Sequence, residues 1–147
     1  MWCNLLPRAY DILGRAVRYT AELDSVHFTH LSFIPQRREN KLGAGTGLCG
    51  LVAGRCGASS VTFSDNDVQV YTDLLQNAIA NKITQCTFLL LDWNYPTRNW
   101  QRQTFDVILA ADTLFDKEVY EPFFRTLSLL LQSNTDAFCL LSVETRR

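Results

Sequence analysis

Short apolar runs punctuate the chain from residue 60 onward. Three of them have the length and composition of β-strands: SVTFS (60–64), CTFLLL (86–91) and FDVILA (105–110). The second and third are nearly continuous apolar runs, which are typical of strands covered on both faces of a parallel sheet. A further strand is predicted over AFCLLSV (137–143).

Helical periodicity fills the segments between these strands. Apolar residues recur at helical spacing from Val68 to Ile79 and again from Phe123 to Leu131. Pro122 suits the first turn of the second helix, and another helix is predicted to open near Leu48. The alternation of strands and helices predicts an α/β fold in which helical crossovers join parallel strands.

The first forty residues carry a weaker pattern. Apolar residues between Leu6 and Val17 fall on one helix face, so residues 1–40 are predicted as a helical segment and residues 41–147 as the α/β domain. Residues 33–41 (FIPQRRENK) stand where a protein with a glycine turn should have its first strand. Their charged side chains indicate that this segment is not a buried central strand.

Composition narrows the function classes. The 147 residues are 47% hydrophobic, which fits one globular domain, and 14 Lys plus Arg against 15 Asp plus Glu disfavour a nucleic-acid substrate or an anionic membrane as partner. The five cysteines include no CxxC pair, so we expect reduced thiols and no metal site. Neither a membrane span nor a signal peptide is evident, which predicts a protein of the cell interior, in the nucleus or the cytoplasm.

The segment LGAGTGLCG (42–50) is the most informative local signal. Gly43, Gly45 and Gly47 alternate, and Gly50 follows three residues later. Glycine permits positive φ and lacks Cβ, so the turn can bend tightly and let a ligand approach the backbone where a helix begins. The spacing fits both GxGxxG of dinucleotide-binding proteins and GxGxG of S-adenosylmethionine methyltransferases. A tight turn without a ligand is the alternative.

Acidic and aromatic residues follow two of the predicted strands. Asp65 lies 22 residues beyond Gly43, where its carboxylate could accept hydrogen bonds from both ribose hydroxyls of an adenosine cofactor. Its alternative role is to cap the next helix. Asp92 and Trp93 follow the next strand, at the same edge of the sheet. Open α/β sheets bind their ligands at this edge.

Four segments together, LGAGTGLCG, VTFSD, LLLDW and FDVILAADTLF, resemble the protein-lysine methyltransferases of methyltransferase family 16. The resemblance extends from about Leu42 to Arg147, and the C-terminal part is similar in particular to the methyltransferase-like protein 22 branch. It implies a Rossmann-like class I methyltransferase fold, with a mostly parallel sheet that has helices on both faces and lacks the family's last strands. It also implies S-adenosyl-L-methionine as the cofactor.

The resemblance assigns cofactor contacts to individual residues. The glycine turn would surround the methionine part of S-adenosylmethionine, and the acidic residue after the second strand would hold the ribose. The Asp-Trp pair would place its carboxylate near the adenine amino group and its indole on the adenine face. These residues are Gly43, Gly45, Gly47, Asp65, Asp92 and Trp93. An ordinary core position is the alternative for Trp93.

Asp112 and Phe115 are the residues that the resemblance places at the reaction. Asp112 would fix the incoming amine by a hydrogen bond and Phe115 would wall an apolar channel, unless Asp112 is only a loop or capping carboxylate. Thr113 and Leu114 stand where enzymes that methylate planar bases or glutamine carry two prolines. The pattern therefore favours a lysine amine of a protein substrate.

Two departures from the family pattern open alternatives. Lys41 stands where the family has an acidic residue, which reverses the charge beside the cofactor's amino group. The chain also ends after the fifth strand of the family fold, two strands early, as a truncated form would, and leaves an apolar sheet edge. A truncated cofactor-binding or interaction protein with little or no activity is therefore one alternative. An NAD-binding dehydrogenase fragment is another, although it leaves the two Asp-aromatic pairs unexplained.

Overall fold

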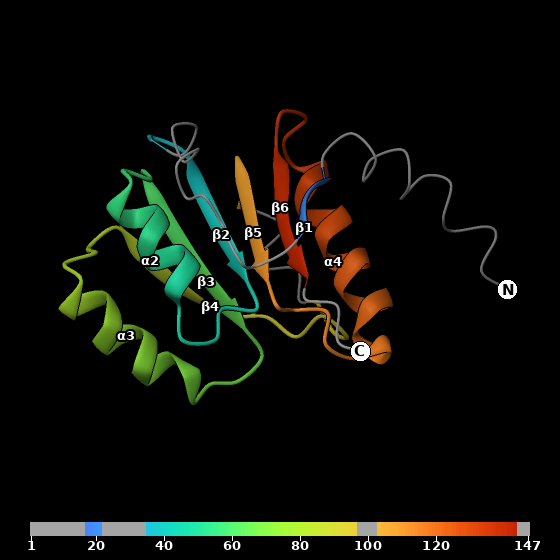
Figure 1. The fold of residues 1–147 in the computed structure, drawn as a ribbon, viewed down its shortest axis with the longest axis horizontal. Coiled ribbons are helices and arrows are strands. Elements are labelled where there is room, and N and C mark those ends of the chain that lie inside the picture. The colour runs from blue at the N-terminus through green and yellow to red at the C-terminus, as the bar shows by residue number, and fades with distance from the viewer. Residues whose placement is uncertain (1–16, 22–34, 97–102, 144–147) are drawn as a thin grey trace, which may run out of the picture.

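The computed structural model describes residues 17–21, 35–96 and 103–143 (Figure 1). The chain forms six strands, three α-helices and one short 3-10 helix in that part. In order they are β1 (Val17–Ala21), β2 (Arg38–Leu42), α2 (Leu48–Arg55), β3 (Ser60–Asp65), α3 (Val70–Ala80), β4 (Cys86–Leu90), β5 (Val107–Ala111), η4 (Lys117–Val119), α4 (Tyr120–Gln132) and β6 (Phe138–Val143).

The six strands form one sheet in the order β1-β6-β5-β2-β3-β4, and every neighbouring pair is parallel. The helices α2 and α3 lie on one face of the sheet, and α4 lies on the other (Figure 1). This arrangement confirms the predicted α/β class with helices on both faces. Its order reverses direction between β2 and β5, where an open sheet forms its ligand crevice.

Two apolar cores hold the layers together. Beneath α2 and α3, Phe63 packs with Leu74 and Val107, all fully buried. On the opposite face, Phe123 and Leu127 of α4 lie in a core with Leu42 of β2 and alternate residues of β5 and β6. The strands β5 and β6 contribute to both cores, which explains why their sequences are apolar almost throughout.

The central strand β2 is an exception to that apolar pattern. Glu39, Asn40 and Lys41 are all buried, and β2 lies between β3 and β5. The prediction that residues 33–41 hold no buried central strand is therefore wrong. Local partners satisfy part of this polarity: the Ser64 hydroxyl donates a 2.8 Å hydrogen bond to Asn40 Oδ1, whereas Asn40 Nδ2 and the Glu39 carboxylate have no partner among the described residues.

Arg38 links the start of β2 to the start of β5 through hydrogen bonds and an ion pair with Asp106. Its backbone N–H and its guanidinium both donate to the carboxylate of Asp106, with Nη2 to Oδ1 at 2.8 Å. This bonding holds the pKa of Asp106 below its ordinary value. A bidentate pair at the end of a strand fixes its register, so the polar strand enters the sheet in one alignment.

The N-terminal third differs from its prediction. Val17, expected at the end of a helix, opens the strand β1, and most of the predicted Leu6 to Val17 helix lies outside the described residues. The predicted boundary at residue 41 falls inside β2. β1 pairs with β6, the last predicted strand, along the edge that was expected to be exposed. Hydrogen bonding by β1 therefore covers that edge.

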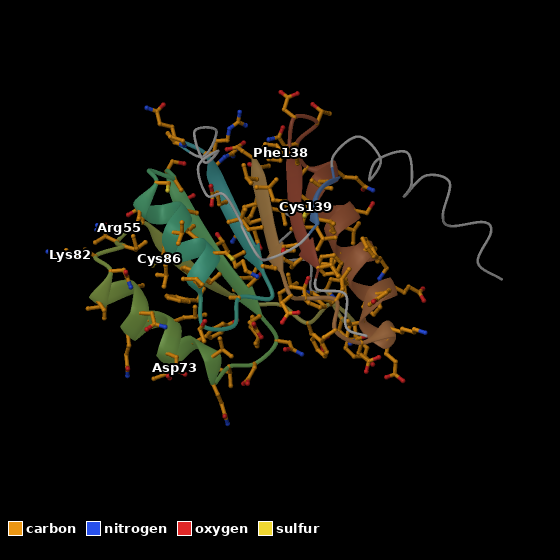
Figure 2. The ribbon with its side chains drawn as sticks, viewed as in Figure 1. Arg55, Asp73, Lys82, Cys86, Phe138 and Cys139 are labelled. Carbon is orange, nitrogen blue, oxygen red and sulfur yellow. The ribbon has the colours of Figure 1, made fainter. Side chains whose placement is uncertain are left out.

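Arg55, Asp73 and Lys82 project away from the sheet on the side of α2 and α3 (Figure 2), where Leu48, Leu75 and Ile79 are exposed as well. The described cysteines, Cys49, Cys56, Cys86 and Cys139, are free thiols. Within the described ranges, no helix could cross a membrane and no cluster of three or more metal-ligating side chains occurs.

Glu39 makes stability depend on pH. Both carboxylate oxygens lack a hydrogen-bond partner among the described residues, and burial raises the pKa of Glu39 from 4.5 to about 8. Since the folded state holds this proton more tightly than the unfolded chain, the free energy of unfolding falls as the pH rises from 4.5 to about 8.

We expect Glu39→Gln to reduce this fall in stability by about 2–4 kcal/mol. Urea unfolding of the original protein and of Glu39→Gln between pH 5 and pH 8 measures how the free energy of unfolding changes with pH. Equal pH slopes for the two proteins would contradict the assignment.

Candidate functional site

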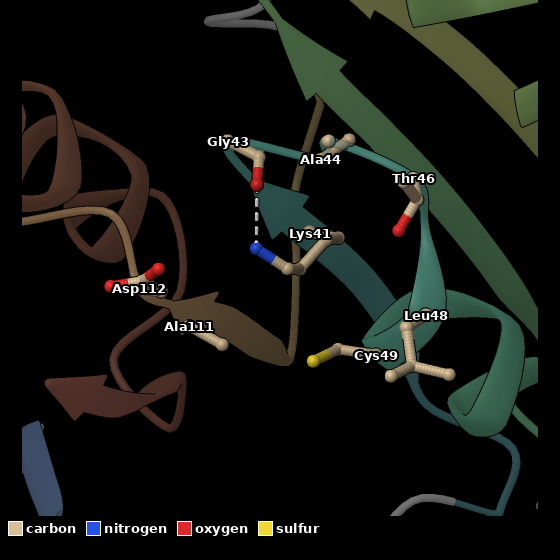
Figure 3. Close-up of a pocket in the computed structure, with 9 residues that line it drawn as sticks. Lys41, Gly43, Ala44, Thr46, Leu48, Cys49, Ala111 and Asp112 are labelled. Atoms are coloured by element: carbon tan, nitrogen blue, oxygen red, sulfur yellow. Dashed lines mark hydrogen bonds between the residues drawn. The ribbon is translucent and has the colours of Figure 1, made fainter. Parts of the chain in front are cut away.

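A pocket of about 280 Å³ opens at the carboxyl ends of β2 and β5 (Figure 3). Its volume is near the lower end of the roughly 300–1,000 Å³ that is typical of small-molecule sites. The glycine turn, the first turn of α2 and the end of β5 supply its walls. The lining residues are Lys41, Gly43, Ala44, Gly45, Thr46, Leu48, Cys49, Ala111 and Asp112.

The turn between β2 and α2 depends on glycine conformations. Gly43, Gly45 and Gly47 have φ values of 66°, 51° and 89°, in the left-handed region that other residues rarely adopt. Backbone bonds close the turn: Ala44 N–H donates to the Ser64 carbonyl and Gly47 N–H donates to the Ala44 carbonyl, each at 2.9 Å. The prediction of a tight glycine turn before a helix is confirmed.

The three glycines differ in what surrounds them. A Cβ on Gly47 would lie 2.4 Å from Leu74 Cδ2, and one on Gly43 would lie 2.9 Å from Thr113 Cγ2. A Cβ on Gly45 would meet nothing within 4 Å. Packing thus excludes side chains at the two outer positions, whereas Gly45 borders open space in which a ligand can approach the backbone.

Asp65 ties the end of β3 to the glycine turn. Its Oδ2 accepts a hydrogen bond from Gly45 N–H at 3.0 Å, and its Oδ1 accepts one from Asp67 N–H at 3.1 Å. The helix α3 has Gln69 at its N-cap, so Asp65 does not cap it. A carboxylate has about four acceptor positions, which leaves Asp65 able to accept from a ligand hydroxyl as well.

Asp112 lies at the opposite wall of the pocket, directly after β5. Its φ is 52°, and its N–H donates to the Ser142 carbonyl at 3.1 Å. The left-handed conformation costs a non-glycine residue about 1–2 kcal/mol. Strain of this kind concentrates at functional positions, where the surrounding structure imposes it. Figure 3 shows Asp112 across the pocket from Leu48 and Cys49 of α2.

Lys41 reaches from β2 into the same pocket and is only 3% exposed. Its Nζ donates to the carbonyl of Leu42 at 3.1 Å and to that of Gly43 at 2.6 Å (Figure 3). Burial lowers the pKa of Lys41, while the nearby Asp65 and Asp112 act in the opposite direction. The sequence marked Lys41 as a charge reversal but gave no sign that its amine caps the turn.

The remaining predicted site residues lie outside the pocket lining. Asp92 Oδ1 accepts from Asn94 N–H at 2.8 Å, and the Trp93 ring packs edge to face on Phe123 with centroids 5.2 Å apart. Phe115 is 60% exposed. The structure thus brings Gly43, Gly45 and Asp112 together, with Gly47 and Asp65 bonded into the same turn. The roles of all the predicted site residues stay predictions.

Sequence reasoning missed several lining residues, namely Thr46, Leu48, Cys49 and Ala111. Thr46, Leu48 and Cys49 stand in the turn or the first helical turn after it, so their position next to the glycines was an available signal. Ala111 directly follows the predicted strand 105–110, next to Asp112, and this position was the available signal.

The parallel sheet and the glycine turn define a Rossmann-like domain, and solved methyltransferases share its fold. Protein arginine methyltransferase 10 of Arabidopsis thaliana gives a TM-score of 0.53 at 13% identity, over 69% of this chain and 28% of that chain. Coclaurine N-methyltransferase, solved with N-methylheliamine and S-adenosylhomocysteine, gives 0.50 at 20% identity, over 67% and 26%. Likeness at these identities shows the fold alone.

The sequence profile of the lysine methyltransferase family matches residues 20–147. The chain therefore belongs to this family, as the resemblance implied. Relatives include the calmodulin-lysine N-methyltransferase of Arabidopsis thaliana, 35% identical over 66% of this chain and 34% of the relative. The histidine protein methyltransferase 1 homolog of Dictyostelium discoideum is 31% identical over 97% and 46%. The chain spans a third to about half of their lengths.

Substitutions in the turn separate packing from backbone conformation. We expect Gly47→Ala to lower the free energy of unfolding by about 2–4 kcal/mol, because the new methyl overlaps Leu74 and the φ is unfavourable. Gly45→Ala is the matched control, with a positive φ but open space, and should cost about 1 kcal/mol. Denaturant unfolding measures both, and equal losses would show that packing against Leu74 plays no part.

Proposed function

We propose that this protein transfers a methyl group from S-adenosyl-L-methionine to a lysine side chain of a protein substrate. The observation that carries the proposal is the pocket in which the glycine turn and Asp112 face each other, in a chain of the lysine methyltransferase family. Membership of this family also argues against the NAD-binding dehydrogenase alternative. The assignment to one branch within the family stays a prediction.

The pocket fits the cofactor at the turn. Open space beside Gly45 admits a ligand to the backbone, and the turn stands at the beginning of α2. In this proposal the turn holds the methionine part, and Asp65 accepts hydrogen bonds from the ribose. Asp92 and Trp93 at the end of β4 serve the adenine; Trp93 lies beside Gly43, since a Cβ there would be 3.2 Å from its ring. When bound, S-adenosylmethionine supplies a methyl group on a sulfonium, which is a good leaving group.

Asp112 is proposed to hold the substrate amine. Asp112 lines the pocket opposite the turn, and its left-handed backbone conformation fixes the point from which its side chain extends. The amine must be neutral to attack, yet a free lysine is only about 0.1% neutral at pH 7.4. Phe115, exposed on the segment after Asp112, would supply an apolar wall that desolvates the amine and lowers its pKa. Positioning of the nitrogen in line with the methyl carbon then supplies most of the catalysis.

Protein nitrogen as the acceptor is supported by the names of the relatives. They methylate calmodulin lysine, histone arginine or protein histidine according to their names, and METTL21A of Xenopus tropicalis is a protein N-lysine methyltransferase, 29% identical over 85% of this chain. Lysine is favoured here because the matching family carries that description. In this proposal the enzyme works inside the cell on a protein, with neither nucleic acid nor membrane as substrate; the free thiols support that location.

Cofactor binding tests the first half of the proposal. Calorimetric titration of the folded chain with S-adenosylmethionine should give saturable one-to-one binding. Asp65→Asn should weaken it about tenfold, since two hydrogen bonds to a charged acceptor become weaker bonds to a neutral one. Asp73→Asn, on the outer surface of α3, is the matched control and should bind like the original protein. No saturation at millimolar cofactor would contradict the proposal.

Methyl transfer tests the second half. With radiolabelled S-adenosylmethionine and cell extract as the substrate source, label should appear on lysine after hydrolysis of the proteins. Asp112→Asn should reduce transfer at least a hundredfold while the affinity for S-adenosylhomocysteine changes less than threefold, because the carboxylate acts on the amine. Asp116→Asn makes the same chemical change four residues away and is the matched control. Label on arginine or histidine alone, or undiminished transfer by Asp112→Asn, would overturn this assignment.

A further inference from the structure

The exposed aromatic side chains of the described residues gather at one edge of the sheet. Tyr95 is 79% exposed, Phe115 60% and Tyr120 39%. Tyr95 follows β4, Phe115 follows β5, and Tyr120 opens α4. Because the strands are parallel, the segments after β4 and β5 leave the sheet at its carboxyl edge, where α4 begins (Figure 1). The pocket opens at the same edge.

Contacts with α4 hold the turn after β4 beside this helix. Arg125 Nη2 donates to the Asn94 carbonyl at 3.0 Å. The turn itself is closed by a 3.1 Å hydrogen bond from Tyr95 N–H to the Asp92 carbonyl. Since Arg125 stands in the second turn of α4, Tyr95 lies close to the beginning of this helix, which Tyr120 opens.

Carboxylates accompany these aromatic side chains. Residues 92–96 and 112–125 hold five Asp or Glu against two Lys or Arg, whereas the whole chain is nearly balanced at 15 against 14. Glu118 and Glu121 are both exposed, and neither forms an ion pair with another described residue. Asp112 lines the pocket on the same segment. Negative charge therefore extends from the pocket wall to the start of α4.

A surface of this composition favours a positively charged partner. Exposed aromatic side chains that gather in one place are typical of interaction sites, where they supply apolar contact area. The face of an aromatic ring also attracts ammonium and guanidinium groups. Carboxylates add an attraction that extends over about 8 Å at physiological ionic strength. The same charges repel nucleic acids and anionic membranes.

We propose that Tyr95, Tyr120, Glu118 and Glu121 form a docking surface for a basic segment of the protein substrate, in which Lys or Arg residues flank the target lysine. The segment that leads from the pocket wall at Asp112 to this docking surface is only a few residues long. A bound segment can therefore place its flanking residues on the docking surface and its target lysine at the pocket. This inference rests on the proposed function and names the substrate class for it.

Binding of two labelled peptides tests the docking surface directly. Both peptides have one lysine in a glycine and serine background, and the flanking positions carry arginine in one peptide and glutamate in the other. Fluorescence anisotropy with the whole chain should show saturable binding of the arginine peptide, which weakens as salt is added. The glutamate peptide should bind at least about tenfold more weakly, because its charge has the wrong sign.

Substitutions locate the binding on the protein. Glu118→Gln combined with Glu121→Gln removes two charges and should weaken binding of the arginine peptide about fivefold. Asp73→Asn combined with Asp136→Asn is the matched control, because it removes the same net charge from α3 and from the opposite edge of the sheet. This control should bind the peptide within about twofold of the original protein. Tyr95→Leu keeps apolar area without a ring face and should weaken binding about threefold.

Methyl transfer to the arginine peptide connects the docking surface with the reaction. Glu118→Gln combined with Glu121→Gln should raise KM about fivefold and leave kcat within about twofold of the original, because the surface binds residues beside the target lysine and not the reacting amine. A loss of kcat with an unchanged KM would contradict the docking role. Thermal unfolding verifies that each variant is folded.

The outcomes separate this inference from the proposed function. Equal binding of the two peptides, no saturable binding of the arginine peptide at millimolar concentration, or an equal loss in the control pair overturns the docking surface. Dimerisation of the chain that the two glutamate substitutions abolish overturns it as well, because the occupant would then be a second copy. Binding of the arginine peptide without methyl transfer to it or to cell extract overturns the proposed function and leaves the surface for basic segments in place.

Discussion

The site depends on one constraint, the left-handed backbone of the turn that leaves the central strand. Gly43, Gly45 and Gly47 allow β2 to bend directly into α2, and the bonds from Gly45 to Asp65 and from Asn77 to the Thr46 carbonyl hold the turn from two other elements. Because the turn is fixed from both sides, the space beside Gly45 is formed before any ligand arrives. Preorganisation of this kind lowers the entropy lost on binding.

The strand β2 has an unusual number of buried polar residues for a central strand. Glu39, Asn40 and Lys41 follow one another through the middle of the sheet, and the carboxyl group of Glu39 has no partner among the described residues. Burial of such groups costs stability, and apolar residues would pack there at lower cost. Two of the three point to the same face as α2, and the one nearer the turn is Lys41, whose amine reaches the pocket. These destabilising polar groups thus lie next to the pocket, where a charge can act on a ligand.

Local patterns predicted most of this fold, because β3 to β6 are apolar runs and the helices between them show apolar residues at helical spacing. Spacing placed Asp65 at the end of a strand, and the resemblance to the family pointed to Asp112, which directly follows β5. It failed for β2, since residue type reveals polarity but not the partners Ser64 and Asp106 that make polarity tolerable. It failed for β1 because pairing with β6 joins segments more than a hundred residues apart. The capping of the turn by Lys41 depends on three-dimensional geometry in the same way.

The central claim is that a nucleoside cofactor lies on the glycine turn. Amide nitrogen and proton chemical shifts, followed while S-adenosylhomocysteine is added to the labelled chain, test it most directly. The account predicts saturable shifts at Gly43, Gly45 and Asp112, with small changes along β1 and the outer face of α3. Shifts confined to other regions, or a spectrum unchanged at millimolar ligand, would contradict it.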